Sequence, residues 1–132
     1  MKRIVIDTNV YSFLLRGRMD IAQFLSTYDI VLVPAVVLGE LEAGFRKGSR
    51  YEQNKAALKK FLSVSSVRAL DVTSAAAETY GRIYSELHAV GAMIPINDVW
   101  IAAQTMSENA PLVTFDAHFR KINGLDLILK EV

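Results

Sequence analysis

The stretch RIVIDTNV, residues 3–10, decides how the rest of the chain is interpreted. Four residues of strand character run directly into Asp7, and Thr8 and Asn9 follow. Continuous apolar runs of this kind are typical of parallel strands that are covered on both faces. Aspartate is also a good N-cap for a helix. By itself, Asp7 therefore indicates either a helix cap or the edge of a polar site.

Apolar runs and helical segments alternate along the chain. Further strand-like runs are IVLV at 30–33, VRALDV at 67–72, LVT at 112–114 and LDLIL at 125–129. Helices are predicted after Asp20, from Pro34 to Gly48, from Ser49 to about Ser63, from Ser74 to about Val90, and from Asn97 to about Ser107. Asp20 and Ser49 each precede a Gln or Glu, Gln23 and Glu52, at capping-box spacing, and proline is favoured at the first position of a helix. This order predicts an α/β fold, a three-layer α/β/α sandwich around a mostly parallel sheet of about five strands.

Length and composition bound the remaining possibilities. The chain has 132 residues, which fits a single domain (1–132), and residues 34–63 are expected to form a helical hairpin within it. Hydrophobic residues make up 52% and charged residues 22%, which excludes a disordered chain. Cysteine is absent, which excludes disulfides and thiolate metal sites. The first apolar run stops at Asp7 without a cleavage site, and no run approaches the roughly 20 residues of a membrane span, so a cytoplasmic protein is expected.

The net charge of +1 offers no general attraction for nucleic acid, but basic residues cluster locally. Within the expected hairpin lie Arg46, Lys47, Arg50, Lys55, Lys59 and Lys60. A charge run of this kind is either a solvated helix face or a binding surface. The sequence leaves both interpretations open.

Glu40, in PAVVLGELEAG (34–44), is the first of three further carboxylates that attract attention. At 100° per residue it falls between Val36 and Val37 on the helical wheel, among small and apolar neighbours. A buried charge without a partner is costly, so Glu40 is expected to have one, unless the position is in fact a wet helix face. Glu42 points elsewhere and is expected at the surface.

The other two carboxylates are Asp98 and Asp116. Asp98 belongs to INDVWIAAQTM (96–106), where Asn97 can cap the helix and an aspartate in the first turn favours the helix dipole. Its carboxylate also stands at the leading end of the core-facing stripe. Asp116 follows the strand LVT by two residues, a place where turn aspartates are equally common.

Loops and helix starts converge at the carboxyl ends of the strands of an open parallel sheet, so these four carboxylates can meet in one crevice. Carboxylates placed together repel unless a cation lies between them. Without cysteine, hard oxygen ligands favour Mg²⁺ or Mn²⁺, which activate water and stabilise the charge of a phosphoryl transition state. His88 and His118 stand alone in the sequence, and neither is expected to be a metal ligand or a general base. No nucleophile elbow, P-loop or dinucleotide fingerprint is present.

The ordered set IVIDTNV (4–10), VLGELEAG (37–44), INDVWIAA (96–103) and LVTFDAHF (112–119) resembles the PIN-domain ribonucleases, in particular the VapC-type toxins of toxin–antitoxin pairs. The resemblance spans residue 3 to about residue 129. It implies that Asp7, Glu40 and Asp98 are the metal-site acids and that Asp116 is the fourth. It further implies that the polar residues Thr8, Asn9 and Thr114 hold these acids in place by hydrogen bonds.

The resemblance also implies a reaction and partners. The expected reaction is Mg²⁺- or Mn²⁺-dependent endonucleolytic cleavage of RNA by metal-activated water. The expected partners are a cognate antitoxin and a second copy of the chain, in a homodimer or a larger toxin–antitoxin complex. The hairpin would grip the antitoxin, or its basic residues would line the RNA path. The alternatives are a housekeeping RNA-processing nuclease and a non-catalytic RNA- or protein-binding module.

Overall fold

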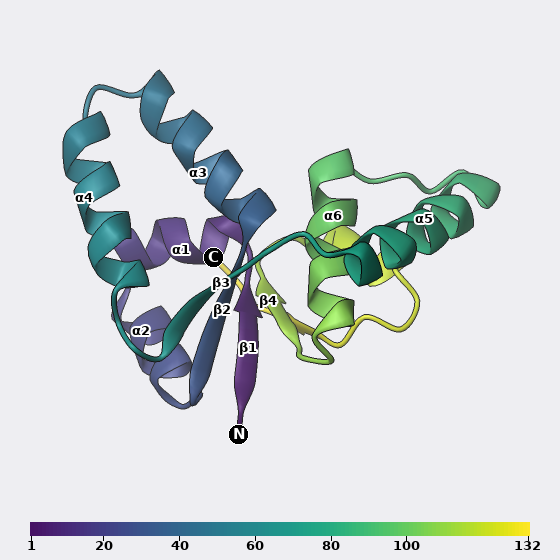
Figure 1. Cartoon of the computed structure of the whole chain (residues 1–132), viewed down its shortest axis with the longest axis horizontal. Coiled ribbons are helices and arrows are strands. Elements are labelled where there is room, and N and C mark those ends of the chain that lie inside the picture. Colours follow the sequence, from purple (N-terminus) through teal and green to yellow (C-terminus); the bar gives the residue numbers. More distant parts are fainter.

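A single parallel sheet forms the centre of the molecule in the computed structural model, which describes residues 1–132 (Figure 1). The strand order is β3-β2-β1-β4-β5, and every neighbouring pair is parallel. The strands are β1 (Arg3–Ile6), β2 (Ile30–Pro34), β3 (Val67–Leu70), β4 (Leu112–Thr114) and β5 (Leu127–Leu129). The predicted five-stranded sheet is confirmed, and it is parallel throughout.

Helices cover both faces of this sheet. They are α1 (Thr8–Leu15), α2 (Met19–Ser26), α3 (Ala35–Lys47), α4 (Tyr51–Leu62), α5 (Ser74–Ala89), α6 (Ile96–Ser107) and a short 3₁₀ helix, η1 (Ala117–Lys121). Figure 1 places α1 to α4 on one side of the sheet and α5 and α6 on the other. This arrangement confirms the three-layer sandwich. None of these helices is both long and apolar enough to span a membrane.

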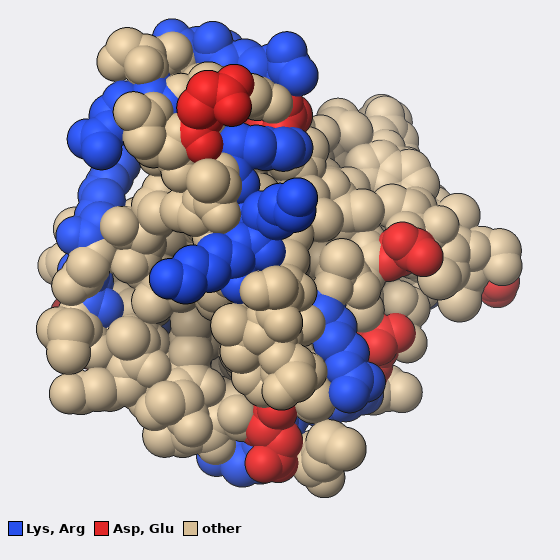
Figure 2. All heavy atoms as spheres, turned by 60° about the vertical axis from the view of Figure 1, so that its left-hand side comes forward, with Lys and Arg blue, Asp and Glu red and all other residues tan.

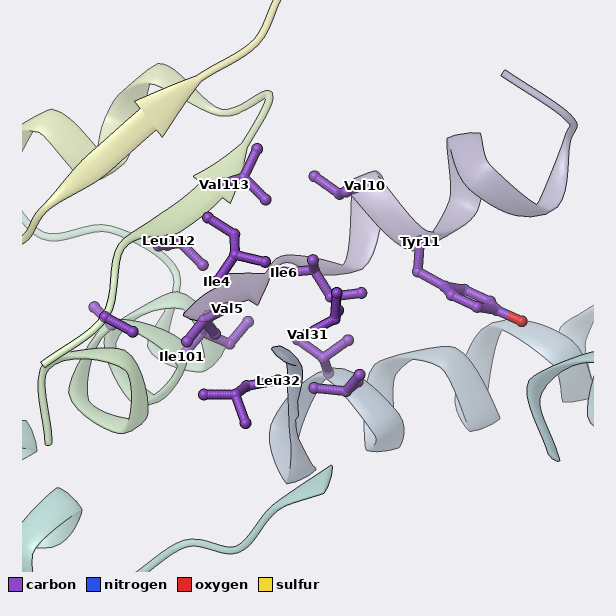
Figure 3. Packing of buried hydrophobic residues seen from close by; sticks show 14 of the residues in the cluster. Ile4, Val5, Ile6, Val10, Tyr11, Val31, Leu32, Ile101, Leu112 and Val113 are labelled. Carbon is purple, nitrogen blue, oxygen red and sulfur yellow. The ribbon is translucent and has the colours of Figure 1, made fainter. Parts of the chain in front are cut away.

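The central strand β1 explains why the opening apolar run carries no polar alternation. Ile4, Val5 and Ile6 are fully buried, because helices lie over both faces of β1. Side chains of β2 and β4 flank β1, and Ile101 of α6 packs against the sheet (Figure 3). The edge strand β3 is different, since two of its four residues are exposed. The buried centre therefore fixes β1, and with it the position of the residue that follows.

Three of the predicted helix starts are wrong. Helix α2 begins at Met19 with Arg18 as its N-cap, and the Asp20 carboxylate instead pairs with the Arg18 guanidinium at 2.6 Å. Helix α4 begins at Tyr51, so Ser49 does not cap it. Pro34 ends β2 and precedes α3 instead of opening it. The ion pair accounts for Asp20, and pairing of Pro34 with Leu70 of β3 accounts for Pro34.

The predicted helical hairpin is confirmed as α3 and α4, and Glu42 joins them. The Glu42 carboxylate accepts hydrogen bonds from Arg46 Nε (2.7 Å), Lys55 Nζ (2.6 Å) and Tyr51 Oη (2.6 Å). Lys55 and Tyr51 are the largest causes that lower the pKa of Glu42 to about 2. Glu42 is therefore a partly exposed surface residue, as expected, but it is held between two helices by these contacts. It also engages two of the clustered basic residues.

Candidate active site

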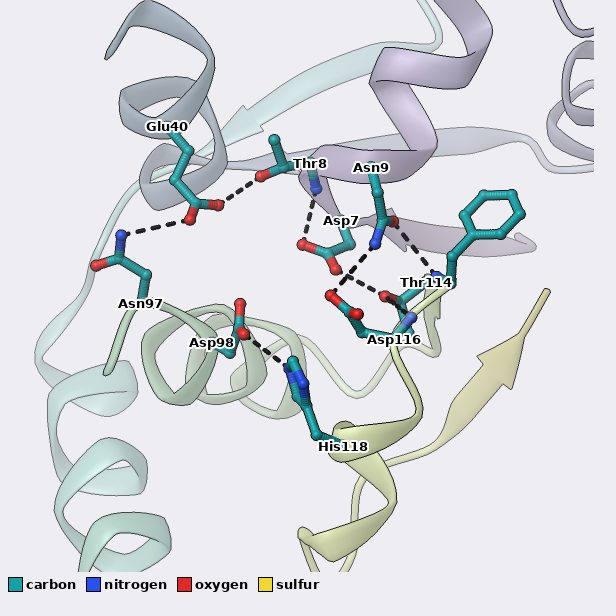
Figure 4. Close-up of polar contacts among 10 residues, drawn as sticks. Asp7, Thr8, Asn9, Glu40, Asn97, Asp98, Thr114, Asp116 and His118 are labelled. Carbon is teal, nitrogen blue, oxygen red and sulfur yellow. Dashed lines mark hydrogen bonds and ion pairs between the residues drawn. The ribbon is translucent and has the colours of Figure 1, made fainter. Parts of the chain in front are cut away.

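The carboxyl ends of β1 and β4 open into a depression of about 860 Å³ that collects all four predicted carboxylates. Asp7 directly follows β1, and Asp116 lies two residues beyond β4. Glu40 projects from α3, and Asp98 projects from the first turn of α6 (Figure 4). Segments separated by up to 109 positions in sequence thus meet at one edge of the sheet, as the parallel topology requires.

Asp7 is both a helix cap and part of this depression. Its Oδ1 accepts a hydrogen bond from the Thr8 backbone N–H (2.7 Å), which starts α1, and its Oδ2 accepts one from Thr114 Oγ1 (2.7 Å). Only 3% of the residue is exposed. This burial is the largest cause that raises the pKa of Asp7 to about 6, against the two hydrogen bonds, which lower it. The negative charges of Asp98 and Glu40 raise it further.

The Glu40 carboxylate has hydrogen-bond partners, as its small and apolar neighbours in the sequence led us to expect. Its Oε1 accepts a hydrogen bond from Thr8 Oγ1 at 2.5 Å, and its Oε2 lies 3.4 Å from Asn97 Nδ2. Thr8 therefore contacts two of the acids, one through its backbone and one through its hydroxyl. Asn97 lies inside α6, whose N-cap is Pro95, so the prediction that Asn97 caps this helix is wrong. Its amide faces the carboxylates instead.

Asp98 is held by His118, a histidine that stands alone in the sequence. His118 Nε2 lies 2.7 Å from Asp98 Oδ2, and both side chains are largely buried. Burial is the largest cause that raises the pKa of Asp98, and His118 opposes it. His118 therefore belongs to the site as a partner of Asp98, a contact that the sequence did not indicate, whereas His88 lies on α5 outside the depression. The tight turn of η1 brings His118 back to the site, and no apolar pattern signals that turn.

Asp116 is the most exposed of the four acids and is held by two neighbours. Its backbone N–H donates to Thr114 Oγ1 (3.0 Å), and Asn9 Nδ2 donates to its carboxylate (3.4 Å). Asn9 Oδ1 in turn accepts a hydrogen bond from the Phe115 N–H (3.3 Å). Each of the three predicted supporting residues, Thr8, Asn9 and Thr114, thus contacts at least one acid.

The charges of this site fit a divalent cation. None of the four carboxylates forms an ion pair with lysine or arginine, and the single ionisable partner is His118. Ligand atoms of Asp98, Asp116 and His118 lie within 4.8 Å of one another. Carboxylate oxygens suit Mg²⁺ and Mn²⁺. The donor set therefore accepts the ion that would relieve the mutual repulsion of the acids.

Comparison with known sequences identifies the family. The PIN domain matches residues 4–125, which is nearly the whole chain. The chain belongs to the PIN-domain family. Among the relatives of this PIN protein, ribonuclease VapC2 of Rickettsia felis is 30% identical over 128 residues, which cover 93% of this chain and 94% of the relative. Ribonuclease VapC4 of Mycobacterium tuberculosis is 27% identical, and the match covers 97% of both chains.

Solved structures extend the comparison of this PIN protein to the fold. A chain of VapBC-1 from nontypeable Haemophilus influenzae superposes with a TM-score of 0.87 at 27% identity, over 96% of this chain and 97% of that one. A chain of VapBC2 from Rickettsia felis, bound to a DNA fragment of its promoter, gives a TM-score of 0.84 at 28% identity, over 96% and 98% of the two chains. The family resemblance expected from the four motifs is confirmed.

Proposed function

We propose that this PIN protein is a metal-dependent endoribonuclease that acts as the toxin of a toxin–antitoxin pair. The observation that carries the proposal is the convergence of Asp7, Glu40, Asp98 and Asp116 in one depression, where none of them forms an ion pair with lysine or arginine. The relatives named ribonuclease VapC support RNA as the substrate, because the match spans nearly the whole of both chains.

The proposal assigns a role to each of these residues, either binding the metal or positioning an acid. Asp7, Glu40, Asp98 and Asp116 would hold Mg²⁺ or Mn²⁺. The bound ion would activate water for attack at phosphorus and stabilise the charge of the transition state. Thr8 and Thr114 hold the carboxylates of Glu40 and Asp7 in fixed directions, so that little reorganisation is needed when the ion and the phosphodiester bind.

The same proposal includes protein partners. Similar chains occur in structures of VapBC complexes, which supports a cognate antitoxin for this chain. In this proposal the hairpin of α3 and α4 is the element that grips the antitoxin. A homodimer, alone or within a larger toxin–antitoxin complex, and a cytoplasmic location complete the proposal. A housekeeping RNA-processing nuclease would share the chemistry, but its expression would not arrest growth in a way that an antitoxin relieves.

The proposal is tested by RNA cleavage with the purified protein. We expect cleavage in Mg²⁺ or Mn²⁺, none in EDTA, and recovery when the metal is restored. Asp98→Asn should abolish cleavage, because it removes a charged ligand from the site. Asp126→Asn is the matched control, since Asp126 is an exposed aspartate outside the depression. Cleavage that survives exhaustive chelation, or an active Asp98→Asn protein, would refute the mechanism.

A further inference from the structure

His118 adds a nitrogen ligand to one part of the acidic depression. Its Nε2 lies 2.7 Å from Asp98 Oδ2, and ligand atoms of Asp98, Asp116 and His118 all lie within 4.8 Å of one another. Figure 4 shows the imidazole ring turned towards the Asp98 carboxylate. We refer to Asp98, Asp116 and His118 as the mixed triad. It differs from the other two acids of the site, Asp7 and Glu40, because one of its ligand groups is not an oxygen.

Two short segments hold the mixed triad in place. Asp116 and His118 lie two positions apart at the start of η1, and Asp98 lies in the first turn of α6. The His118 ring packs against Phe119, with the ring centroids 4.9 Å apart, and Phe119 is fully buried. The imidazole is thereby anchored to the core while it still lines the depression. A ligand group that its neighbours hold in this way needs little rearrangement when a metal binds.

No basic side chain competes with a cation at the mixed triad. Neither Asp98 nor Asp116 forms an ion pair with lysine or arginine. Arg16 lines the same depression, but it pairs with no carboxylate. Lysine and arginine side chains instead gather over the end of the molecule that carries the hairpin of α3 and α4 (Figure 2). The triad therefore offers two carboxylates and one imidazole to a cation that enters the depression.

The imidazole decides which class of cation the triad favours. Carboxylate oxygens suit Mg²⁺ and Mn²⁺, whereas an imidazole nitrogen suits Zn²⁺ and similar transition metals. The chain has no cysteine and only two histidines, and His118 is the one that lines the depression. A preference for Zn²⁺ over Mg²⁺ beyond that of the carboxylates alone must therefore depend on this residue.

The spacing of the mixed triad also suits Zn²⁺. Zinc often takes three protein ligands and one water in a tetrahedral arrangement. With Zn–N and Zn–O bonds of about 2.0–2.2 Å, two ligand atoms of such a site lie about 3.4 Å apart. The 2.7 Å between His118 Nε2 and Asp98 Oδ2 is below this value, and the 4.8 Å limit for the triad is above it. Small side-chain rotations are enough to bring the three groups around one ion.

We propose that Asp98, Asp116 and His118 bind Zn²⁺ and that this ion inhibits the enzyme by competing with Mg²⁺. This inference rests on the proposed ribonuclease function. Zn²⁺ bound by the mixed triad occupies two of the four acids assigned to the catalytic ion and holds them close to His118. Only Asp7 and Glu40 then remain for Mg²⁺, which binds weakly when it has few carboxylates. The two ions therefore exclude each other from the depression.

The first experiment measures metal binding to the metal-free protein by isothermal titration calorimetry at pH 7.5, without any substrate. His118→Gln should raise the Kd for Zn²⁺ by about 100-fold or more, since even residues that only orient a metal ligand contribute about 10–100-fold. The Kd for Mn²⁺ should stay within about threefold of wild type, because Mn²⁺ favours oxygen ligands and the amide can keep the contact with Asp98. His88→Gln is the matched control, since His88 is exposed on α5 outside the depression.

The second experiment identifies the ligand atom by nitrogen NMR of the imidazole rings. The chain has only two histidines, so the His88→Gln and His118→Gln variants assign every imidazole signal. Zn²⁺ should shift the Nε2 signal of His118 to the range of a metal-bound nitrogen and leave the signals of His88 in place. Mg²⁺ should not produce this shift, because it favours oxygen ligands.

The third experiment follows RNA cleavage in Mg²⁺ while Zn²⁺ is added. Zn²⁺ should inhibit wild type and His88→Gln alike, and a higher concentration of Mg²⁺ should relieve the inhibition. His118→Gln, compared with its own rate in the absence of Zn²⁺, should need about 100-fold more Zn²⁺ for the same fractional inhibition. If this variant cleaves too slowly for the comparison, calorimetry and NMR decide whether the mixed triad binds Zn²⁺.

The outcomes distinguish this inference from the proposed function. Equal Zn²⁺ affinity in wild type and His118→Gln would overturn the inference. Equal losses of Zn²⁺ and Mn²⁺ binding would also overturn it, because His118 would then only position Asp98. Cleavage that persists when Zn²⁺ fills the triad, or that Zn²⁺ alone supports, would overturn the inhibitory role. A wild-type protein that cleaves no RNA in Mg²⁺ or Mn²⁺ would refute the proposed function, and the binding experiments would still decide whether the triad binds Zn²⁺.

Discussion

Asp7 couples the stability of the protein to its proposed activity. The carboxylate is 3% exposed, and its pKa is raised to about 6 from an ordinary value of 3.8. Because the folded state holds the proton more tightly than the unfolded chain, this group destabilises the fold as the pH rises from about 4 through 6. At neutral pH, with no cation bound, the full loss of unfolding free energy caused by the Asp7 charge is present. A group that costs stability and yet caps a helix is typical of a functional position.

Asp7→Asn should therefore stabilise the metal-free protein and inactivate it. The amide retains an oxygen that can cap α1 but removes the buried charge. At pH 7.5 in EDTA the free energy of unfolding should rise by up to about 3 kcal/mol, the equivalent of the pKa shift, and near pH 4 it should hardly change. Urea denaturation at both pH values measures this. If Asp7→Asn were less stable than wild type at pH 7.5 while Asp126→Asn behaved as wild type, the destabilising effect assigned to the Asp7 charge would be contradicted.

His118 gives a second prediction at this scale. Its contact with Asp98 lowers the pKa of that carboxyl against the effect of burial. Without the imidazole the pKa of Asp98 should rise further, so protons should compete more strongly with the metal at low pH. We expect His118→Phe to weaken Mn²⁺ binding more at pH 6 than at pH 8, and His118→Gln, which keeps a donor, to restore most of it.

Electron paramagnetic resonance of free Mn²⁺ measures this binding without any substrate. His88→Phe is the control, since His88 lies on α5 outside the acidic depression. Equal binding by wild type and His118→Phe at both pH values would return His118 to a packing role.

Gln104 connects the elements that carry the acids. It lies in α6, is 1% exposed, and donates from Nε2 to the carbonyl oxygens of Leu70 (2.9 Å) and Asp71 (3.1 Å). Its Oε1 lies 3.4 Å from the Val36 N–H in the first turn of α3. One side chain therefore links α6, which carries Asp98, to the end of β3 and to the helix that carries Glu40.

Gln104→Met should uncouple these elements while filling similar space. Because two buried carbonyl groups lose their hydrogen-bond donor, the free energy of unfolding should fall by about 1–3 kcal/mol. Cleavage should fall more than this loss of stability explains, because α3 and α6 lose their shared anchor. Ile83→Val on α5 is the control, a core change expected to cost about 0.5–1.5 kcal/mol at a distance from the acids. Equal activity of the two variants, compared at equal folded fraction, would show that Gln104 serves stability alone.

The sequence predicted the elements better than their ends. Continuous apolar strands and helical periodicity depend on burial, which the parallel sheet imposes over several residues at once, so β1 and α5 were predicted to within one residue. A cap depends on a single hydrogen bond, which other contacts such as the Arg18–Asp20 ion pair can replace, and neither Asp20 nor Ser49 caps its predicted helix. His118 was missed for the same reason. Its place in the site depends on the turn of η1 and on a contact with Asp98 that no local pattern records.

At the scale of the whole molecule, the fold brings together like charges that it does not neutralise. The four acids come from segments on both sides of the sheet and meet only in the folded chain. The unfolded chain offers no such site, so a cation that binds there must favour the folded state. The four positions could be proposed from sequence because strand ends and helix starts share one sheet edge. The contacts between them could not, because they depend on side-chain directions.

Mn²⁺ or Mg²⁺ should therefore raise the thermal stability of the protein. At a concentration 100 times its Kd, a single bound ion adds about 2.7 kcal/mol. For a domain of this size that corresponds to a rise in Tm on the order of 10 °C. Differential scanning fluorimetry in EDTA and in each metal measures this, with KCl of equal ionic strength as the control for screening. Asp98→Asn and Asp116→Asn should lose most of the rise, whereas Asp126→Asn should keep it. A rise that KCl reproduces, or that survives in Asp98→Asn, would mean that the four acids repel one another without forming a metal site.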